Sequence, residues 1–498
     1  MRYNNPVMKG FYPDPSVCKV NDTYYLVCSS FQYFPGVPLF ESTDLINWRQ
    51  IGHCLTRSSQ VQLNQINSSG GVFAPTIRHH RGRFYMTTTN DTTRHNFYIW
   101  TDDIYREWSE PIEVDQGGID PDLYFEEDRT YFMSNGQDVE GIPGIVQCEI
   151  DIETGRKLTP SRTIWQGTGG RYLESPHMYR IDDMYYLLAA EGGTEYGHME
   201  TYARSSSVNG PFTPYPHNPV LTNRNLGGYE LQGVGHGDLV QDHQGNWWMF
   251  HLGFRQIGRW QTYHHLGREV FLSPVTFQED GWFTAGEHGT TLLTFETDRI
   301  ADDVIQSELK RYTFEHTDWQ LDWCYLRHPH KEHYVLEDKR LLLTGTNVSL
   351  DDADSPTWIG LRQRDFDAVI SCDVQMCDAD GEAGMTLYMD EHHHYELAMI
   401  QQGSYREVFV RLRVGDIQSV QQRVALDTNQ PIQLRIEATR EKYSFFTVQN
   451  NRQMSLGYAQ TKYLSSEVAG GFTGVLIGLY AYGAGAVAEF TNFECTYG

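Results

Sequence analysis

Basic residues are scarce in this chain, which has 39 Lys and Arg against 65 Asp and Glu and a formal net charge of −26. Nucleic-acid affinity comes mainly from Lys and Arg that neutralise phosphates, so this balance argues against a nucleic-acid partner and equally against an anionic membrane. Apolar runs of eighteen residues are also missing, so the sequence predicts no membrane-spanning helix. The composition favours a soluble protein that acts on an uncharged substrate.

Cysteine is sparse as well, because the eight cysteines are scattered and no two form a Cys-x-x-Cys pair. The first residues, MRYNNPVMKGFYPDPS, contain no apolar segment of the kind that a signal peptide needs. Free, buried thiols in a reducing compartment are the simplest interpretation, and no zinc site is expected. We therefore expect a cytoplasmic, bacterial-type protein.

A pattern that recurs five times organises the first 290 or so residues. Each copy has a polar or small residue, a short apolar strand, a turn rich in Gly, Asp or Asn, and then a pair of ring-bearing residues; the copies begin at Tyr12, Phe73, Ile119, Leu173 and Gly235. Such repeats of about four short strands are typical of propeller blades, so five copies predict five blades. The first strand of each blade lines the central channel, and equivalent residues of these strands should therefore meet at one axis.

The residues at the equivalent position of the five copies are Asp14, Ala74, Asp120, Glu174 and His236. Any one of these polar residues could simply cap its own turn. Three carboxylates at the same repeat position favour instead a shared site on the propeller axis. The sequence thus predicts one pocket that contains two aspartates, a glutamate and a histidine.

The repeat ends near residue 295, which divides the chain into two domains. We assign residues 1–295 to the propeller, 296–311 to a connector, and 312–498 to a second domain of alternating strands and turns. The strand spacing of that second domain predicts an antiparallel, jelly-roll-like β-sandwich. Because helix signals are weak throughout, the expected class is all-β: a five-bladed β-propeller followed by a C-terminal β-sandwich.

Hydrolysis of a glycosidic bond requires at least two carboxylates on opposite sides of a pocket. One is held protonated and donates to the leaving oxygen, while the other is ionised and either activates water or attacks carbon. A third carboxylate can raise the pKa of the acid by like-charge repulsion. From the residues alone, Asp14, Asp120 and Glu174 are the catalytic candidates, but which is acid and which is base stays open.

Several ordered motifs resemble glycoside hydrolase family 43, most closely its two-domain branch of β-xylosidases and α-L-arabinofuranosidases. They include GFYPDPS, GGVFAPTIRHHRGRFYM, GIDPDLYF, GGRYLESPHMYR, GHGDLVQD and HHLGREVFLSPV. In the second half, GEAGMTLYMDEHHHYELAMI resembles the C-terminal sandwich of that branch. The resemblance implies that Asp14 is the general base, Asp120 the aspartate that tunes and orients the acid, and Glu174 the general acid of an inverting hydrolysis.

The resemblance also implies a substrate-binding set, which consists of Phe31, Phe73, Ala74, His236 and Arg268. Phe31 and Phe73 would wall the pocket of the terminal sugar, and Arg268 would hold its hydroxyls. His236 matches a channel histidine that in some relatives lies near a bound calcium ion or a water cluster. We expect that no cofactor is required. As an alternative, a calcium ion could lie near His236, which would contact it indirectly, or in the sandwich at the acidic run 351–354.

The expected function is exo-acting release of terminal β-D-xylosyl or α-L-arabinofuranosyl units from hemicellulose-derived oligosaccharides. Relatives suggest that loops of the sandwich close one end of the site, which turns a cleft into a pocket that accepts chain ends, and that the protein forms a homodimer or homotetramer. Two alternatives stay open: an endo-arabinanase on the same propeller, and a carbohydrate-binding propeller without catalysis.

Overall fold

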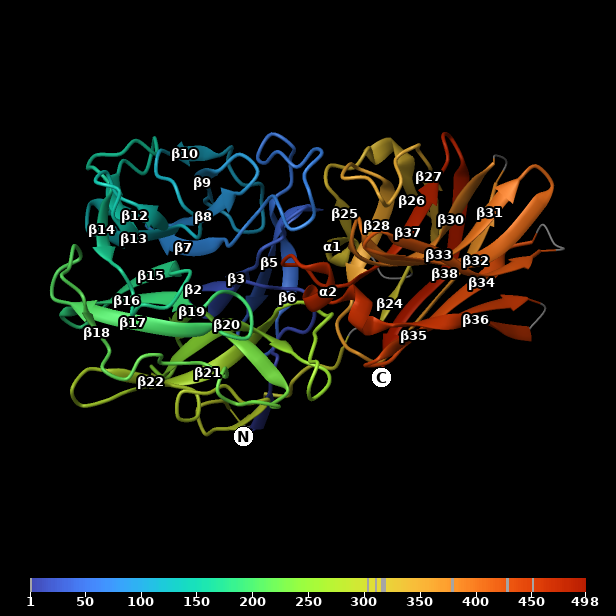
Figure 1. Cartoon of the computed structure of the whole chain (residues 1–498). Coiled ribbons are helices and arrows are strands. Elements are labelled where there is room, and N and C mark those ends of the chain that lie inside the picture. The colour runs from blue at the N-terminus through green and yellow to red at the C-terminus, as the bar shows by residue number, and fades with distance from the viewer. Residues whose placement is uncertain are drawn as a thin grey trace.

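The computed structural model describes residues 2–301, 304–309, 311–314, 319–377, 380–426, 430–449 and 452–498. Figure 1 shows two bodies side by side: a ring of small sheets, blue to green, and a pair of larger sheets, orange to red. None of the helices within these ranges has the length and apolarity needed to span a membrane.

Five antiparallel four-stranded sheets form the ring, and each is built from strands that follow one another along the chain. Blade 1 contains β2 (Ser16–Val20), β3 (Thr23–Val27), β5 (Gly36–Ser42) and β6 (Arg49–Leu55); blade 2 contains β7 (Thr76–His80), β8 (Arg83–Asn90), β9 (His95–Thr101) and β10 (Ile112–Val114); blade 3 contains β11 (Asp122–Glu126), β12 (Arg129–Gln137), β13 (Pro143–Ile150) and β14 (Arg162–Trp165); blade 4 contains β15 (Glu174–Ile181), β16 (Met184–Glu191), β17 (Met199–Ser205) and β18 (Thr213–Pro214); blade 5 contains β19 (Leu231–Gln241), β20 (Trp247–Arg255), β21 (Glu269–Phe277) and β22 (Phe283–Ala285). The prediction of a five-bladed propeller is confirmed.

The local sequence explains the hairpins that begin each blade. Asn21 and Arg81 lie at the predicted turns and have φ angles of 54° and 48°, a left-handed conformation that tight hairpin turns require. Strands such as β8 are buried along nearly their whole length, because neighbouring blades cover both faces of each sheet. The apolar segments therefore read as continuous runs rather than as an alternating pattern.

The ring closes without a strand shared between the first and last blades. A short two-stranded sheet joins β1 (Arg2–Asn4) to β23 (Thr294–Glu296). Tyr3 packs on Phe295 and Trp248, with ring centroids 5.6 and 6.1 Å away, in an apolar cluster that also contains residues of blade 1. The short β1–β23 sheet, backbone hydrogen bonds such as that from Val7 N to Val270 O and this side-chain packing thus hold the two ends of the propeller together.

Two antiparallel sheets of eight strands form the second body and enclose one large apolar core. One sheet contains β24 (Tyr312–Thr313), β26 (Tyr334–Glu337), β27 (Arg340–Thr344), β29 (Ala368–Met376), β34 (Ile432–Ala438), β35 (Lys442–Gln449), β36 (Arg452–Gln460) and β38 (Val487–Tyr497); the other contains β4 (Tyr33–Phe34), β25 (Cys324–Leu326), β28 (Thr357–Arg362), β30 (Gly381–Asp390), β31 (His393–Gln402), β32 (Tyr405–Val414), β33 (Ile417–Ala425) and β37 (Leu476–Tyr482). Residues of β29 alternate between buried and half-buried, as expected for a sheet with one face on a core. The predicted β-sandwich is confirmed.

Helices are short, in agreement with the weak helix signals of the sequence. Among the residues that the structure describes, they are α1 (Trp319–Asp322), α2 (Ser466–Ala469) and two 3₁₀ turns, Lys331–His333 and Thr461–Leu464. The two bodies are interlocked, because β4 departs from blade 1 and pairs with β25 at the edge of a sandwich sheet. In Figure 1, α2 lies between the two bodies, on the side of the sandwich that faces the propeller.

Candidate active site

The residues at the repeat position share an unusual backbone conformation. Asp14, Asp120 and His236 have φ angles of 55°, 55° and 59° immediately before or within the innermost strand of their blades. Left-handed backbone is uncommon outside glycine and is tolerated best by Asp, Asn and His. The shared conformation gives these three residues the same relation to the strand that follows.

Blade 4 departs from the predicted alignment by one residue. There the left-handed residue is Ser175, with a φ of 55°, and a β-bulge lies between Glu174 and His177. The strand register agrees, since the cross-strand pairs are Ser16 with Val27, Thr76 with Thr87, Asp122 with Met133 and His177 with Leu188. Ser175 is therefore the equivalent of Asp14, and Glu174 precedes it; the sequence alignment of this blade was wrong by one position.

Asp14 is a buried carboxylate with a cationic partner. Its Oδ1 atom lies 2.7 Å from Nη1 of Arg268, the Ser29 hydroxyl donates to Oδ2, and His236 Nδ1 lies 3.8 Å from Oδ1. Burial alone would raise the pKa of Asp14, but Arg268, His236 and the Ser29 hydrogen bond outweigh it and lower the pKa below its ordinary value. Asp14 is therefore ionised at neutral pH.

The pKa values of Glu174 and Asp120 shift in the opposite direction, upward. Burial and the nearby charge of Asp14 raise the pKa of Glu174 to about 7, against the opposing effect of Arg268. Burial, followed by repulsion from Glu174 and Asp14, raises the pKa of Asp120 well above its ordinary value, although the Ser175 N–H donates to Asp120 Oδ2 over 3.1 Å. The Ser175 hydrogen bond places Asp120 next to the Glu174 segment, and Asp14 is near enough to raise the pKa values of both, so the fold brings the three carboxylates into one site, as predicted.

Arg268 connects several parts of the site. Besides Asp14, its Nη1 atom donates to Thr194 Oγ1 over 2.9 Å, and its Nη2 atom donates to the backbone oxygen of Phe472 over 3.2 Å. The guanidinium lies 5.8 Å from the ring centroids of both Phe31 and Phe472. The predicted sugar-binding arginine is thus a neighbour of Asp14 and of the sandwich.

Three phenylalanine rings gather beside Arg268. Phe31 and Phe73, both predicted, have ring centroids 5.4 Å apart, and Phe472 stacks on Phe31 at 6.0 Å and meets Phe73 edge-on at 6.1 Å. Phe472 comes from the segment that precedes β37 in the sandwich and keeps 40% of its surface exposed. Flat apolar rings next to convergent polar groups are typical of a sugar site.

The segment that carries Phe472 is fastened to the propeller. Glu467 in α2 accepts hydrogen bonds from His264 N over 3.0 Å, from His264 Nδ1 over 2.8 Å and from the Tyr196 hydroxyl over 2.8 Å. Phe472 N donates to Ser69 Oγ over 2.8 Å. These bonds hold the sandwich segment over the face of the propeller on which the carboxylates lie.

Residues 3–283 match the family described as "Glycosyl hydrolases family 43". Residues 311–496 match a β-xylosidase C-terminal concanavalin A-like domain. The chain belongs to glycosyl hydrolase family 43. It is 38% identical to a non-reducing end α-L-arabinofuranosidase of Bacteroides ovatus over 99% of this chain and 94% of that protein, and 35% identical to a xylosidase/arabinosidase of Butyrivibrio fibrisolvens over 98% and 97%.

Two solved structures have the same two-domain architecture. The GH43B protein of a Bacteroides ovatus xyloglucan PUL superposes with a TM-score of 0.93 at 36% identity over the whole of both chains. A xylan β-1,4-xylosidase from Bacillus halodurans superposes with a TM-score of 0.91 at 29% identity over 99% of both chains. The similarity therefore covers the propeller and the sandwich together.

Several residues of this family 43 site were missed by the sequence analysis. Glu191 accepts hydrogen bonds from the backbone N–H groups of Thr168 and Gly170 over 2.8 and 2.6 Å, and so fixes the loop that leads to Glu174. Ser29, Thr194 and Phe472 contact Asp14 or Arg268 directly. Of these residues, Glu191 and Thr194 carried a signal, because both lie in the segment AEGGTEYGHM at residues 190–199; nothing in the sequence links Phe472 to the propeller.

The remaining predicted residues lie at the site with fewer contacts. Ala74 is buried and offers only a methyl group, and burial lowers the pKa of His236 to about 4, so that its ring is neutral. In the described part of the chain, no three His, Cys, Asp or Glu side chains are grouped so that they could hold a metal ion. In the acidic run of the sandwich, Asp352 accepts from Ser349 and Asp351 faces His394, 3.4 Å away.

Proposed function

We propose that the protein is an exo-acting, inverting glycoside hydrolase that releases terminal β-D-xylosyl or α-L-arabinofuranosyl units from hemicellulose-derived oligosaccharides. The observation that carries this proposal is that the pKa values of two carboxyl groups in one site shift in opposite directions: Asp14 has a lowered pKa, and Glu174 has a pKa of about 7. One ionised and one protonated carboxyl group at near-neutral pH are the base and the acid that glycoside hydrolysis needs.

In the proposed reaction, Asp14 removes a proton from a water molecule as the water attacks the anomeric carbon. The glycosidic bond breaks, and Glu174 gives its proton to the leaving oxygen, so the bond electrons stay with the leaving sugar. The new hydroxyl lies on the opposite face of the ring, which inverts the anomeric configuration. The negative charge of Asp14 favours retention of the Glu174 proton until the leaving oxygen takes it, and Asp120, which accepts a hydrogen bond from the Ser175 N–H, would hold the chain next to Glu174 in place.

Arg268 has two roles in this proposal. Its positive charge keeps Asp14 ionised, and its guanidinium lies 5.8 Å from the rings of Phe31 and Phe472, so the donors that are not used within the protein can bind hydroxyls of a terminal sugar placed against these rings. Because Phe472 reaches the propeller from the sandwich, we infer that the sandwich closes one end of the site. A closed end admits only a chain terminus, which favours exo action over the endo-arabinanase alternative, and the name of the Bacteroides ovatus relative, a non-reducing end arabinofuranosidase, supports the same choice.

The decisive assay compares nitrophenyl β-D-xyloside with nitrophenyl α-L-arabinofuranoside. We expect hydrolysis of at least one of them by the wild type, and release of single pentoses from xylo- or arabino-oligosaccharides. An Asp14→Asn variant serves as the matched control, because it keeps the shape of the side chain and removes the base. Binding of oligosaccharide without hydrolysis would establish the carbohydrate-binding alternative, and internal fragments from a long chain would establish endo action.

We further propose that the protein acts in a reducing, cytoplasmic compartment of a bacterium and forms a homodimer or homotetramer. Seven of the eight cysteines are free and buried, which suits a reducing environment. Trp260 is 97% exposed, and an exposed ring of that size is a candidate for burial between subunits. Light scattering coupled to size-exclusion chromatography measures the oligomeric state, and a Trp260→Ala variant shows whether this ring contributes.

A further inference from the structure

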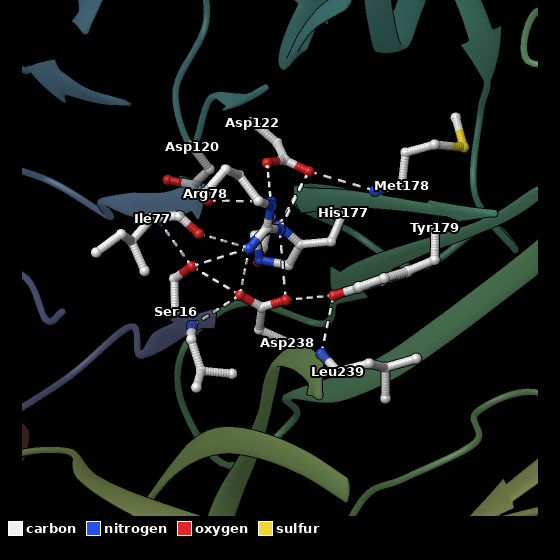
Figure 2. A network of polar contacts seen from close by, with 12 residues as sticks. Ser16, Ile77, Arg78, Asp120, Asp122, His177, Met178, Tyr179, Asp238 and Leu239 are labelled. Atoms are coloured by element: carbon white, nitrogen blue, oxygen red, sulfur yellow. Dashed lines mark hydrogen bonds and ion pairs between the residues drawn. The ribbon is translucent and has the colours of Figure 1, made fainter. Parts of the chain in front are cut away.

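A second polar layer lies below the catalytic carboxylates, around the propeller axis. Figure 2 shows the Arg78 guanidinium between the carboxylates of Asp122 and Asp238. Arg78 Nε lies 3.1 Å from Asp122 Oδ1, and Arg78 Nη1 lies 2.9 Å from Asp238 Oδ2. Both carboxylate side chains are fully buried. Buried carboxylates without a cationic partner are costly, so this guanidinium is what allows two of them to be ionised at the axis.

This layer takes one or more residues from the innermost strand of every blade. Its members are Ser16 of β2, Arg78 of β7, Asp122 of β11, His177 and Tyr179 of β15, and Asp238 of β19. Ser16, Asp122, His177 and Asp238 occupy the position two residues after Asp14, Asp120, Ser175 and His236 respectively. The catalytic layer and the arginine layer are therefore successive side chains of the same strands, with Arg78 at the centre of the second layer.

Several hydrogen bonds close the layer into a ring. The Ser16 hydroxyl donates to Asp238 Oδ2 over 2.7 Å and joins blade 1 to blade 5, where no strand is shared. The Tyr179 hydroxyl donates to the same Asp238 carboxylate, and the Met178 N–H donates to Asp122 over 3.3 Å. Arg78 completes the ring, because its donors reach blades 3, 4 and 5 from blade 2.

Arg78 also determines the state of His177. Arg78 Nη2 lies 2.9 Å from His177 Nδ1, and because a guanidinium can only donate, Nδ1 must be the acceptor. The His177 proton is therefore on Nε2, which is buried and has no hydrogen-bond partner among the described residues. The His177 ring meets the His236 ring at 6.4 Å and 72°, and His236 in turn faces Asp14.

We propose that Arg78 is the resident cation of the propeller axis and a positioning residue for Asp14, acting through His177 and His236. It neutralises the two axial carboxylates, connects all five blades and keeps the histidine pair beneath Asp14 in one arrangement. Since both axial carboxylates already have this partner, the donor set does not fit a calcium ion near His236 in the native protein. The inference rests on the proposed role of Asp14 as the base.

Removal of the guanidinium tests this inference. In Arg78→Ala we expect kcat to fall about a hundredfold, as for a base displaced by about an ångström, with KM changed less than about threefold because Arg78 does not contact the sugar. Millimolar guanidinium should restore part of the lost kcat of this variant. Calcium should also stimulate the variant but not the wild type. The rate of the wild type should not change when a chelator is added. Arg83→Ala, which removes a half-buried arginine of the same hairpin that lies outside the axial layer, is the matched control and should respond to none of these additions.

A second variant covers the case in which Arg78→Ala does not fold. Arg78→Lys keeps the charge but cannot span both carboxylates and His177, so we expect a folded protein whose kcat is lowered several-fold at unchanged KM. The inference is overturned if a folded Arg78→Ala variant has wild-type kcat or is rescued by no cation. It is also overturned if Arg78→Lys has wild-type activity or a changed KM with an unchanged kcat. Inactivation of the wild type by a chelator would overturn it as well. A wild type inactive on both nitrophenyl glycosides would instead contradict the proposed function.

Discussion

The pKa of Glu174 makes the pH dependence of catalysis the most direct test of the proposed acid. At pH 6, a carboxyl group with the ordinary pKa of 4.5 is protonated in only about 3% of molecules, whereas one with a pKa of about 7 is protonated in about 90%. The site thus increases the acid form about thirtyfold. Because a raised pKa preserves the protonated form below it, kcat/KM for an oligosaccharide should be level below pH 7 and fall about tenfold for each pH unit above it.

The assay is a profile of kcat/KM against pH for wild type and Glu174→Gln, with an oligosaccharide and with a nitrophenyl glycoside. On the oligosaccharide, Glu174→Gln should lose about two to four orders of magnitude, the usual contribution of a general acid. On the nitrophenyl glycoside, whose leaving group needs little protonation, the loss should be much smaller and the decline above pH 7 should disappear. A decline that persists unchanged in Glu174→Gln, or equal losses on both substrates, would refute Glu174 as the acid.

Three further outcomes are expected. Asp14→Asn should lose several orders of magnitude in kcat on both kinds of leaving group, since no base remains to activate water; an effect confined to oligosaccharides, measured with the same two substrates, would contradict this role. Phe472→Ala removes ring contacts worth about 0.5–1.5 kcal/mol and should raise KM about two- to tenfold with little change in kcat, whereas an unchanged KM would show that the sandwich does not contribute to sugar binding. Proton NMR of the first product should show the inverted anomer before mutarotation, and an initial excess of the retained anomer would exclude water as the direct nucleophile.

The sequence predicted the fold and the meeting of three carboxylates in one site because both depend on a local signal that repeats. Adjacent residues such as Asn21 or Arg81 determine each hairpin turn. Each blade also repeats the same order of polar residue, strand, turn and aromatic pair. Asp14 and Asp120 could be placed on a common axis for this reason alone. The repeat can predict only those site residues that lie at its equivalent positions.

The features that escaped prediction depend on irregularity or on distant contacts. The β-bulge at Glu174 displaces the acid by one position, and a bulge has no reliable signature in a single sequence. Phe472 and Phe31 are separated by most of the chain, and their contact exists only because the sandwich docks on the propeller. The position two residues after each left-handed residue did contain a readable signal, since Ser16, Asp122, His177 and Asp238 are all polar and recur at the same place in four blades.

The two layers together explain how a ring with no shared closing strand can hold its catalytic groups in strained conformations. Left-handed backbone at Asp14, Asp120 and His236 costs of the order of 1 kcal/mol or more at each residue, and such strain persists only where surrounding contacts over-determine it. The next inward-facing side chains of those same strands form the Arg78 layer, which fixes each strand to its neighbours two residues further on. Loss of that layer should therefore release the strain at the catalytic positions first, so that activity declines before the apolar packing between the blades gives way.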